Sequence, residues 1–313
     1  MLEYHIVVMC YNLHAFFLRK SIIVTTYTLD NLPIDKDRYK IIALDLDDTL
    51  LNSRKEISAV NIEAVQKAHR QGYRIVITTG RHPKSAQRYL SLLNCLDDNS
   101  YSVCYNGSAV IRLSDFIAAH HNINFPVLHH AFLSGQMANE LCTFAHEQHC
   151  FFHGYSKDRG LVVENHNPYS QVEIDHSGVE FLEVDLTSCK PSESFFKVII
   201  VGEKEDIDRV TLAVPQKFCD FCSVLRTSPN FLEFIPEHST KATALEMLCQ
   251  KLGLSMQNVM AFGDAQNDYD MLKNAGLGIA MSNGYDYVKE AADVVTLSND
   301  EDGVAYIINR FLR

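Results

Sequence analysis

Three carboxylates directly follow a short apolar run, and their types and spacing could support chemistry. Residues 41–44 are Ile-Ile-Ala-Leu, and Asp45, Asp47 and Asp48 come next, all within four positions. Carboxylates this close repel each other, and a divalent cation is the usual partner that offsets the repulsion. Oxygen donors without a nearby cysteine or histidine favour Mg²⁺ over zinc. One carboxylate could then act as nucleophile and another as general acid and base; the alternative is a solvated acidic turn after a strand.

A second group of carboxylates follows another apolar run late in the chain. Residues 259–262 are Val-Met-Ala-Phe, and Gly263-Asp264-Ala265-Gln266-Asn267-Asp268 comes next. Short apolar runs that end in a break of pattern are typical of buried parallel strands. Ligand sites of open α/β sheets lie beyond the carboxyl ends of such strands, so both acidic groups are expected at that edge.

Two weaker features could contact an anion. Thr79 and Gly80 end a strand predicted over 74–79, where a hydroxyl and a backbone N–H can bind a phosphate oxygen, although Thr-Gly is usually turn chemistry. Thr79 is preferred to Thr78, which alternates to the other face. Lys241 lies in the first turn of a helix that begins at Thr240, where a cation opposes the helix dipole. An anionic partner would explain this lysine, and a solvated side chain is the alternative.

The elements that must position these residues alternate between strand and helix. This alternation predicts an α/β fold with a doubly wound parallel sheet and right-handed crossovers, built from residues 39–112 and 226–313. Between these segments, residues 113–225 change in rhythm, and we expect a separate antiparallel sheet with helices on one face. Residues 1–38 form an N-terminal extension to which the sequence assigns no role.

The composition is that of an ordinary globular protein. The 313 residues are 47% hydrophobic and 21% charged, and 28 basic against 39 acidic residues give a net charge of −11, so no broad nucleic-acid surface is expected. Nine cysteines, an odd and scattered set, suit reduced thiols in a cytoplasmic protein, and Cys219 and Cys222 are interpreted as structural. The apolar stretch 6–18 is too short to span a bilayer and lacks the features of a signal peptide.

One group of histidines raises the question of a second metal site. His146, His149, Cys150 and His153 have spacings that could line one helix face. Residues 151–152, Phe-Phe, look like the start of a strand, which would break that face. Ordinary surface or core histidines are therefore favoured over a zinc site.

Taken in order, four short motifs resemble those of the haloacid dehalogenase superfamily, and the best match inside it is the Cof-type phosphatases, which include YidA-like sugar-phosphate phosphatases. The resemblance covers about residues 39–313, and four ordered motifs are far more specific than any one of them. It departs at Ala242, where glycine is usual, and at Gln266, where glutamate is usual; neither change removes a reacting group. The motifs are Leu44-Asp45-Leu46-Asp47-Asp48-Thr49-Leu50, Thr79-Gly80-Arg81, Lys241 and Gly263-Asp264-Ala265-Gln266-Asn267-Asp268.

The resemblance implies catalytic and metal-binding roles for the carboxylates. Asp45 would attack phosphorus and form an aspartyl-phosphate, and Asp47 would protonate the leaving oxygen and then deprotonate the attacking water. Asp45, the backbone carbonyl of Asp47 and Asp264 would bind Mg²⁺. Asp268 would support this metal shell.

The resemblance also implies which residues contact the phosphoryl group. Thr79 and the Gly80 amide would bind phosphate oxygens, and Lys241 would neutralise charge between the nucleophile and the phosphoryl group. Asn267 would help orient the phosphoryl group or Asp268. Arg81 could reach a substrate phosphate or the inserted module, or it could form a structural ion pair.

By the same resemblance, residues 113–225 would be a C2-type cap domain that excludes water and sets specificity. The function implied is Mg²⁺-dependent hydrolysis of a small phosphorylated metabolite, without nucleic-acid or membrane partners. A phosphotransferase or phosphomutase that shares the aspartyl-phosphate step is an alternative, and a non-catalytic regulatory protein on the same scaffold is another. Neither the particular substrate nor the oligomeric state follows from the sequence.

Overall fold

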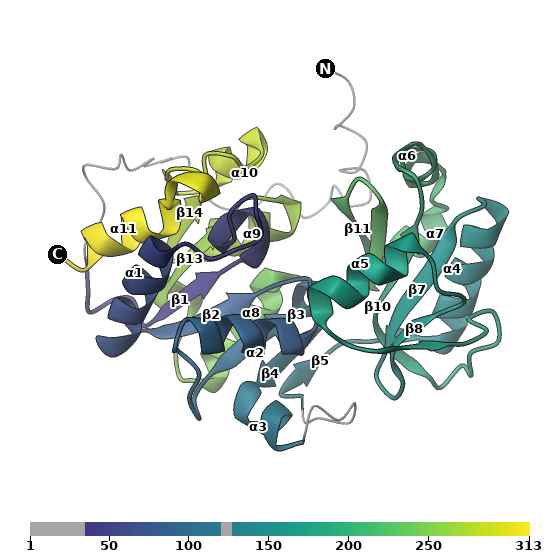
Figure 1. Ribbon diagram of the computed structural model, residues 1–313, viewed down its shortest axis with the longest axis horizontal. Helices are drawn as coiled ribbons and strands as arrows, with labels where there is room; N and C mark the ends of the chain where they lie inside the picture. Colours follow the sequence, from purple (N-terminus) through teal and green to yellow (C-terminus); the bar gives the residue numbers. More distant parts are fainter. Residues whose placement is uncertain (1–34, 120–126) are drawn as a thin grey trace. The chain divides into compact units, whose positions relative to one another are not determined.

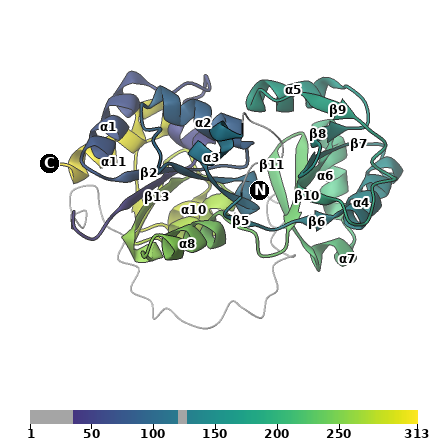
Figure 2. The same cartoon turned by 90° about the horizontal axis from the view of Figure 1, so that it is seen from below.

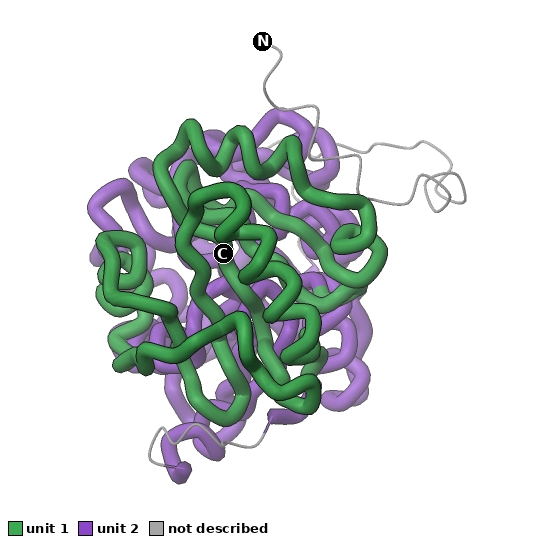
Figure 3. Tube along the Cα trace, turned by 90° about the vertical axis from the view of Figure 1, so that its right-hand side faces the viewer, with its two compact units in different colours: residues 1–22, 122–125, 130–239 green, residues 23–121, 126–129, 240–313 purple. Residues whose placement is uncertain are grey.

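The computed structural model describes residues 35–119 and 127–313, which divide into two compact units. We call His130–Ser239 the insert unit; the core unit holds residues 35–119, 127–129 and Thr240–Arg313 (Figure 3). The N-terminal extension predicted over residues 1–38, with its apolar stretch 6–18, lies outside the described residues except for its last four positions.

The core unit is built on an eight-stranded sheet in the order β15-β14-β13-β1-β2-β3-β4-β5 (Figure 1). From β15 to β3 all neighbours are parallel, and β4 runs antiparallel to β3. The predicted doubly wound parallel sheet is therefore confirmed. The strands are β1 (Ile41–Leu44), β2 (Arg74–Thr78), β3 (Tyr101–Cys104), β4 (Ala109–Arg112), β5 (His129–His130), β13 (Val259–Gly263), β14 (Leu277–Ala280) and β15 (Val294–Val295).

Helices cover both faces of this sheet. Ile41 and Ala43 share an apolar cluster with α8, α9 and α10, whereas α1, α2 and α11 lie on the opposite face, where α11 packs against α1 (Figure 2). Five of the helices, α1, α2, α9, α10 and α11, each follow a parallel strand of this sheet, so the carboxyl ends of these strands open toward helix N-termini. The helices are α1 (Ala59–Arg70), α2 (Pro83–Leu92), α3 (Leu113–Ala118), α8 (Lys241–Lys251), α9 (Tyr269–Asn274), α10 (Asp286–Ala291) and α11 (Gly303–Phe311).

The insert unit has its own sheet, in the order β11-β12-β10-β7-β8-β9, with β6 beside the start of β10. Neighbours are antiparallel except for the parallel pair β8 and β9. The strands are β6 (Leu133–Ser134), β7 (Phe151–Ser156), β8 (Gly160–Val163), β9 (Phe181–Glu183), β10 (Ser194–Val201), β11 (Cys222–Ser228) and β12 (Phe231–Pro236). The helices are α4 (Gly135–Glu147), α5 (Pro168–Ser177), α6 (Lys204–Ala213) and α7 (Gln216–Cys219).

Alternation along β7 shows that both faces of this second sheet are covered. Phe152 packs in an apolar cluster with α4, α6 and α7. Its neighbours His153 and Tyr155 point to the opposite face and contact Asn167 and Glu173 at α5. Helices were expected on one face only, and α5 departs from that expectation because it packs on the face that carries His153 and Tyr155.

The borders of the units differ from those predicted at 113 and 225. Helix α3 belongs to the core unit, whereas β12 pairs with β10, and β11 with β12, in the insert sheet. A local apolar pattern identifies a strand but not the sheet in which it pairs, because pairing depends on distant residues. Among the described residues, no helix is long and apolar enough to cross a membrane.

Candidate active site

The first acidic group lies where β1 ends in the middle of the core sheet. Leu44 is in register with Phe262 of β13, and the Asp45 amide donates to the Phe262 carbonyl at 3.2 Å. The chain then turns tightly over Leu46–Leu50, with Asp48 at a φ of 58°. The carboxyl ends of β1 and β13 are thus side by side, and the two acidic groups meet there.

Lys241 joins these groups. Its ammonium donates to Asp45 Oδ1 at 2.5 Å and to Asp268 Oδ1 at 2.7 Å, and the lysine is completely buried. Thr240 caps the helix, since its hydroxyl accepts from the Thr243 amide. The cation therefore stands at a helix N-terminus because two carboxylates neutralise it there.

Asp268 is held from two sides. Besides the bond from Lys241, its Oδ2 accepts from the amides of Asp264 and Ala265, at 3.0 and 3.1 Å. Gly263 permits this approach, because a Cβ at that position would lie 2.4 Å from Cβ of Asp268. Asp268 is fully buried, so it fixes both the lysine and the turn that carries Asp264.

Asp264 completes a cluster of carboxylates with Asp45 and Asp268. One oxygen from each of the three lies within 4.8 Å of the others, and all three residues are buried. Thr49 donates to Asp264 Oδ1 at 2.7 Å and so orients that carboxylate. Three carboxylates and one ammonium leave two negative charges, which a divalent cation would balance.

The pKa values reflect this crowding of charge. Burial raises the pKa of Asp264 to about 7, with a further rise from Asp268, against the hydrogen bond from Thr49. Burial also raises the pKa of Asp45, while Lys241 lowers it. Burial alone would lower the pKa of Lys241, but Asp268 and Asp45 outweigh it and hold the pKa above its usual range. The lysine is therefore the permanent positive charge of the site.

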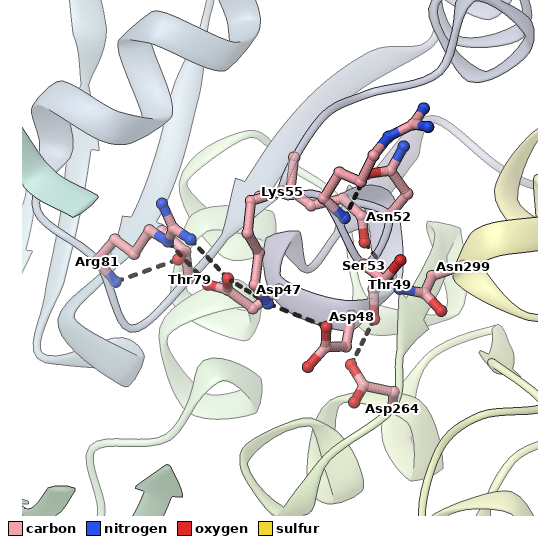
Figure 4. A network of polar contacts seen from close by, with 12 residues as sticks. Asp47, Asp48, Thr49, Asn52, Ser53, Lys55, Thr79, Arg81, Asp264 and Asn299 are labelled. Carbon is pink, nitrogen blue, oxygen red and sulfur yellow. Dashed lines mark hydrogen bonds and ion pairs between the residues drawn. The ribbon is translucent and has the colours of Figure 1, made fainter. Parts of the chain in front are cut away.

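Asp47 lies at the partly exposed rim of the site, where its carboxylate contacts the cationic side chains of Arg81 and Lys55 (Figure 4). Arg81 donates from Nε to Oδ2 at 2.8 Å and from Nη2 to Oδ1 at 2.5 Å, and Lys55 Nζ lies 3.4 Å from Oδ1. Of the two possibilities for Arg81, the structure contains the ion pair. Because both oxygens of Asp47 are engaged, a proton transfer to a substrate requires the guanidinium to release at least one of them.

Thr79, Gly80 and Asn267 gather around Asn106, which follows β3. The Thr79 hydroxyl accepts from the Arg81 amide at 3.1 Å. Asn267 donates to Asn106 Oδ1 at 2.9 Å, and a Cβ at Gly80 would lie 2.8 Å from that same oxygen. Gly80 of the second motif therefore leaves room for the Asn106 side chain, which accepts the hydrogen bond from Asn267 of the fourth motif.

Every residue predicted for the site belongs to the core unit, and the structure brings Asp45, Lys241, Asp264 and Asp268 into direct proximity. Sequence reasoning gave no role to Thr49, Lys55 and Asn106. Thr49 stood inside the first of the four motifs, which was a usable signal, whereas Asn106 lay outside all four. The sequence gives no signal for Lys55, because its contact with Asp47 depends on the fold of the turn between them.

A family model described as haloacid dehalogenase-like hydrolase matches residues 42–308, and the chain belongs to this family of hydrolases. Among its relatives in Bacillus subtilis (strain 168), 5-amino-6-(5-phospho-D-ribitylamino)uracil phosphatase YcsE is 31% identical over 276 residues, covering 87% of this chain and 96% of the relative. Phosphatase YwpJ of the same organism is 26% identical over 297 residues, covering 87% of this chain and 100% of the relative.

A solved structure supports the same assignment. The haloacid dehalogenase-like hydrolase from Bacteroides thetaiotaomicron superposes with a TM-score of 0.74 at 32% identity, covering 87% of this chain and 99% of that one. The family, the fold and the hydrolase class predicted from the four motifs are confirmed. The roles of individual residues stay predictions.

Proposed function

We propose that the protein is a Mg²⁺-dependent phosphatase that hydrolyses small phosphorylated metabolites through an aspartyl-phosphate on Asp45. The observation that carries the proposal is the buried ammonium of Lys241 between Asp45 and Asp268, next to Asp264. Burying several charges together costs stability, and such clusters of ionisable groups are typical of functional sites. Family membership and relatives named as phosphatases support the same reaction.

The donor set of the cluster fits Mg²⁺. All three side chains are carboxylates, which suit a hard cation, and burial raises the pKa of Asp45 and of Asp264, so a bound cation would favour their charged forms. Asp45, Asp264 and the backbone carbonyl of Asp47 would hold the ion directly. Asp268 has both oxygens occupied by Lys241 and backbone amides, which suits a supporting role. When bound, the cation would neutralise charge on the phosphoryl oxygens.

The protein residues divide the reaction between them. Asp45 would attack phosphorus in line with the leaving oxygen, which departs with a proton from Asp47. Asp47 would then take a proton from the water that hydrolyses the aspartyl-phosphate and regenerates Asp45. Lys241 would keep Asp45 ionised and offset charge on the phosphoryl group. Thr79, the Gly80 amide and Asn267 would hold its oxygens.

The insert unit is the proposed cap, and specificity is proposed to reside in it. The name of YcsE gives a phosphorylated ribitylaminouracil as the substrate of that relative, which fits the class of small phosphorylated metabolites for this chain without naming one. A phosphotransferase would share the step on Asp45 and differ only in the acceptor that replaces water.

The test is phosphate release from a panel of phosphorylated metabolites, with Mg²⁺ and with EDTA. We expect Mg²⁺-dependent release from a few related compounds, lost in Asp45→Asn and requiring far more Mg²⁺ in Asp264→Asn. Asp48→Asn is the matched control and should keep most of the turnover, since Asp48 is exposed and bonded to Lys55. Full activity of Asp45→Asn would overturn the proposal. Release only after an acceptor alcohol is added would favour the phosphotransferase.

A further inference from the structure

A second set of metal-ligating side chains lies in the insert unit and includes no residue of the candidate active site. Cys142, His146 and Glu164 each offer one donor atom, and these atoms lie within 4.8 Å of one another. Cys142 Sγ is 3.8 Å from His146 Nε2, which is 2.7 Å from Glu164 Oε2. A sulfur, a nitrogen and an oxygen thus converge on one point.

Local structure explains this convergence. Cys142 and His146 are four positions apart in α4 and therefore lie on one face, one turn apart. Cys142 is buried in the apolar cluster under the helix, while His146 lies in the last turn and is half exposed. Glu164 directly follows β8 and is 18% exposed. The site is therefore closed on the sulfur side and accessible from solvent on the histidine side.

The donor spacing suits a tetrahedral ion. With Zn–S near 2.3 Å and Zn–N near 2.0 Å, sulfur and nitrogen in a tetrahedral site stand about 3.6 Å apart, close to the 3.8 Å in the protein. His146 Nε2 and Glu164 Oε2 are closer, at hydrogen-bond distance. An ion bound to both atoms would take the place of the proton between them and move them less than about 1 Å further apart. Three protein ligands leave a fourth position for water.

The local charge also suits a cation. The Glu164 carboxylate lies beside the thiol of the buried Cys142 and the imidazole of His146. A divalent cation would neutralise both the thiolate and Glu164 while His146 stays neutral. The sulfur and nitrogen donors distinguish this group from the all-oxygen cluster of the core unit and select a softer ion than Mg²⁺.

We propose that Cys142, His146 and Glu164 bind a thiophilic divalent cation of the Zn²⁺ class, which would tie the end of α4 to the segment after β8. Binding releases the thiol proton to solvent and moves the proton of the neutral His146 imidazole from Nε2 to Nδ1, so that Sγ and Nε2 bind the metal with no change of oxidation state. The proposal is independent of the function proposed for the core unit.

The experiment titrates the metal-stripped full chain with Co²⁺ in excess Mg²⁺, which fills the oxygen site. We expect one equivalent of Co²⁺ with a thiolate-to-cobalt charge-transfer band and the visible bands of a tetrahedral ion, and Zn²⁺ should abolish both. Carboxylates cannot give the charge-transfer band. Zn²⁺ should also raise the melting temperature of the intact chain.

Matched variants assign the ligands. Cys142→Ser should lose the charge-transfer band, and His146→Gln should weaken Co²⁺ binding by more than about 100-fold, since losing even an outer-shell partner costs about 10–100-fold. His146 is exposed, so this variant keeps the fold. Cys150→Ser and His149→Gln, a buried thiol and an exposed histidine of the same unit, should bind like the parent. A missing band in the parent, or an unchanged band in either ligand variant, would overturn the proposal.

Discussion

Replacing Lys241 by methionine tests whether this one cation holds the carboxylates of the active site together. The substitution keeps an unbranched side chain that is one atom shorter and removes the charge, which leaves Asp45, Asp264 and Asp268 buried around an apolar group. Removing one partner of a buried ion pair costs about 3–5 kcal/mol. At pH 7.5 in EDTA we therefore expect the free energy of unfolding to fall by about that amount.

Mg²⁺ should reverse much of this loss. A second cation can neutralise the carboxylates, and without the ammonium it no longer meets a positive charge nearby, so Mg²⁺ should stabilise Lys241→Met more than the parent. At pH 5 the loss should shrink, because Asp264, with a pKa of about 7, gains a proton and removes one negative charge. The free energy of unfolding that is regained in this way should not restore turnover, because Lys241 also contacts Asp45, the proposed nucleophile.

The chain offers a matched control for this variant. Lys197 is also buried, and its Nζ lies 2.9 Å from Glu233 Oε1 in the insert unit. Lys197→Met should lose a similar free energy, but Mg²⁺ should stabilise it no more than the parent. The assay is urea unfolding with and without Mg²⁺. Because a protein with two units need not unfold in one step, hydrogen exchange of the β1 amides reports the core unit and that of the β10 amides reports the insert unit. A loss below about 1 kcal/mol for Lys241→Met, or an Mg²⁺ gain equal to that of the parent, would refute the reasoning.

Three further predictions concern the neighbours of the site and the insert unit. Gly263→Ala should place its Cβ against Asp268, displace that carboxylate from Lys241 and lower kcat by up to about 100-fold; an unchanged kcat would contradict the packing. Arg81→Lys keeps a cation beside Asp47 but loses the pair of hydrogen bonds that orients its carboxylate before one bond is released, so kcat should fall more for alkyl phosphates, whose leaving oxygen needs a proton from Asp47, than for nitrophenyl phosphate, and equal slowing would be the contrary result. Burial lowers the pKa of His153 to about 4, so the unfolded chain binds more protons than the folded one between pH 6.5 and 4. Stability should therefore fall as the pH drops, by about 2 kcal/mol between pH 6.5 and pH 5 in urea unfolding, and His153→Gln should flatten that slope.

Features encoded by neighbouring residues could be predicted from the sequence. Thr240 caps α8, at the helix start that the sequence predicted, and Ser58 at α1 and Pro83 at α2 begin their helices by equally local chemistry. The two acidic groups were expected at one edge because parallel strands share the direction of their carboxyl ends. This reasoning places Asp45 and Asp264 together without any knowledge of side-chain contacts.

Features that depend on distant partners could not be predicted. The strand pattern of residues 231–235 is the same in either sheet, and only pairing with β10 places it in the insert unit. The histidines whose spacings could line one helix face lie in different elements. Helix α4 ends at Glu147, as the strand start at Phe151 suggested, and His153 is a buried residue of β7. The ligand partners of His146 are Cys142, within its own helix, and Glu164, which lies beyond two strands.

The most direct test of the central claim is to trap the phosphorylated enzyme. Excess Asp47→Asn protein is mixed with a substrate that has a good leaving group and a labelled phosphoryl group. The reaction is quenched in acid, and the labelled residue is identified by peptide mass. The account predicts Mg²⁺-dependent label on Asp45, formed at least as fast as phosphate is released and absent after Asp45→Asn. Phosphate release without label on Asp45, or label on another residue, would contradict it.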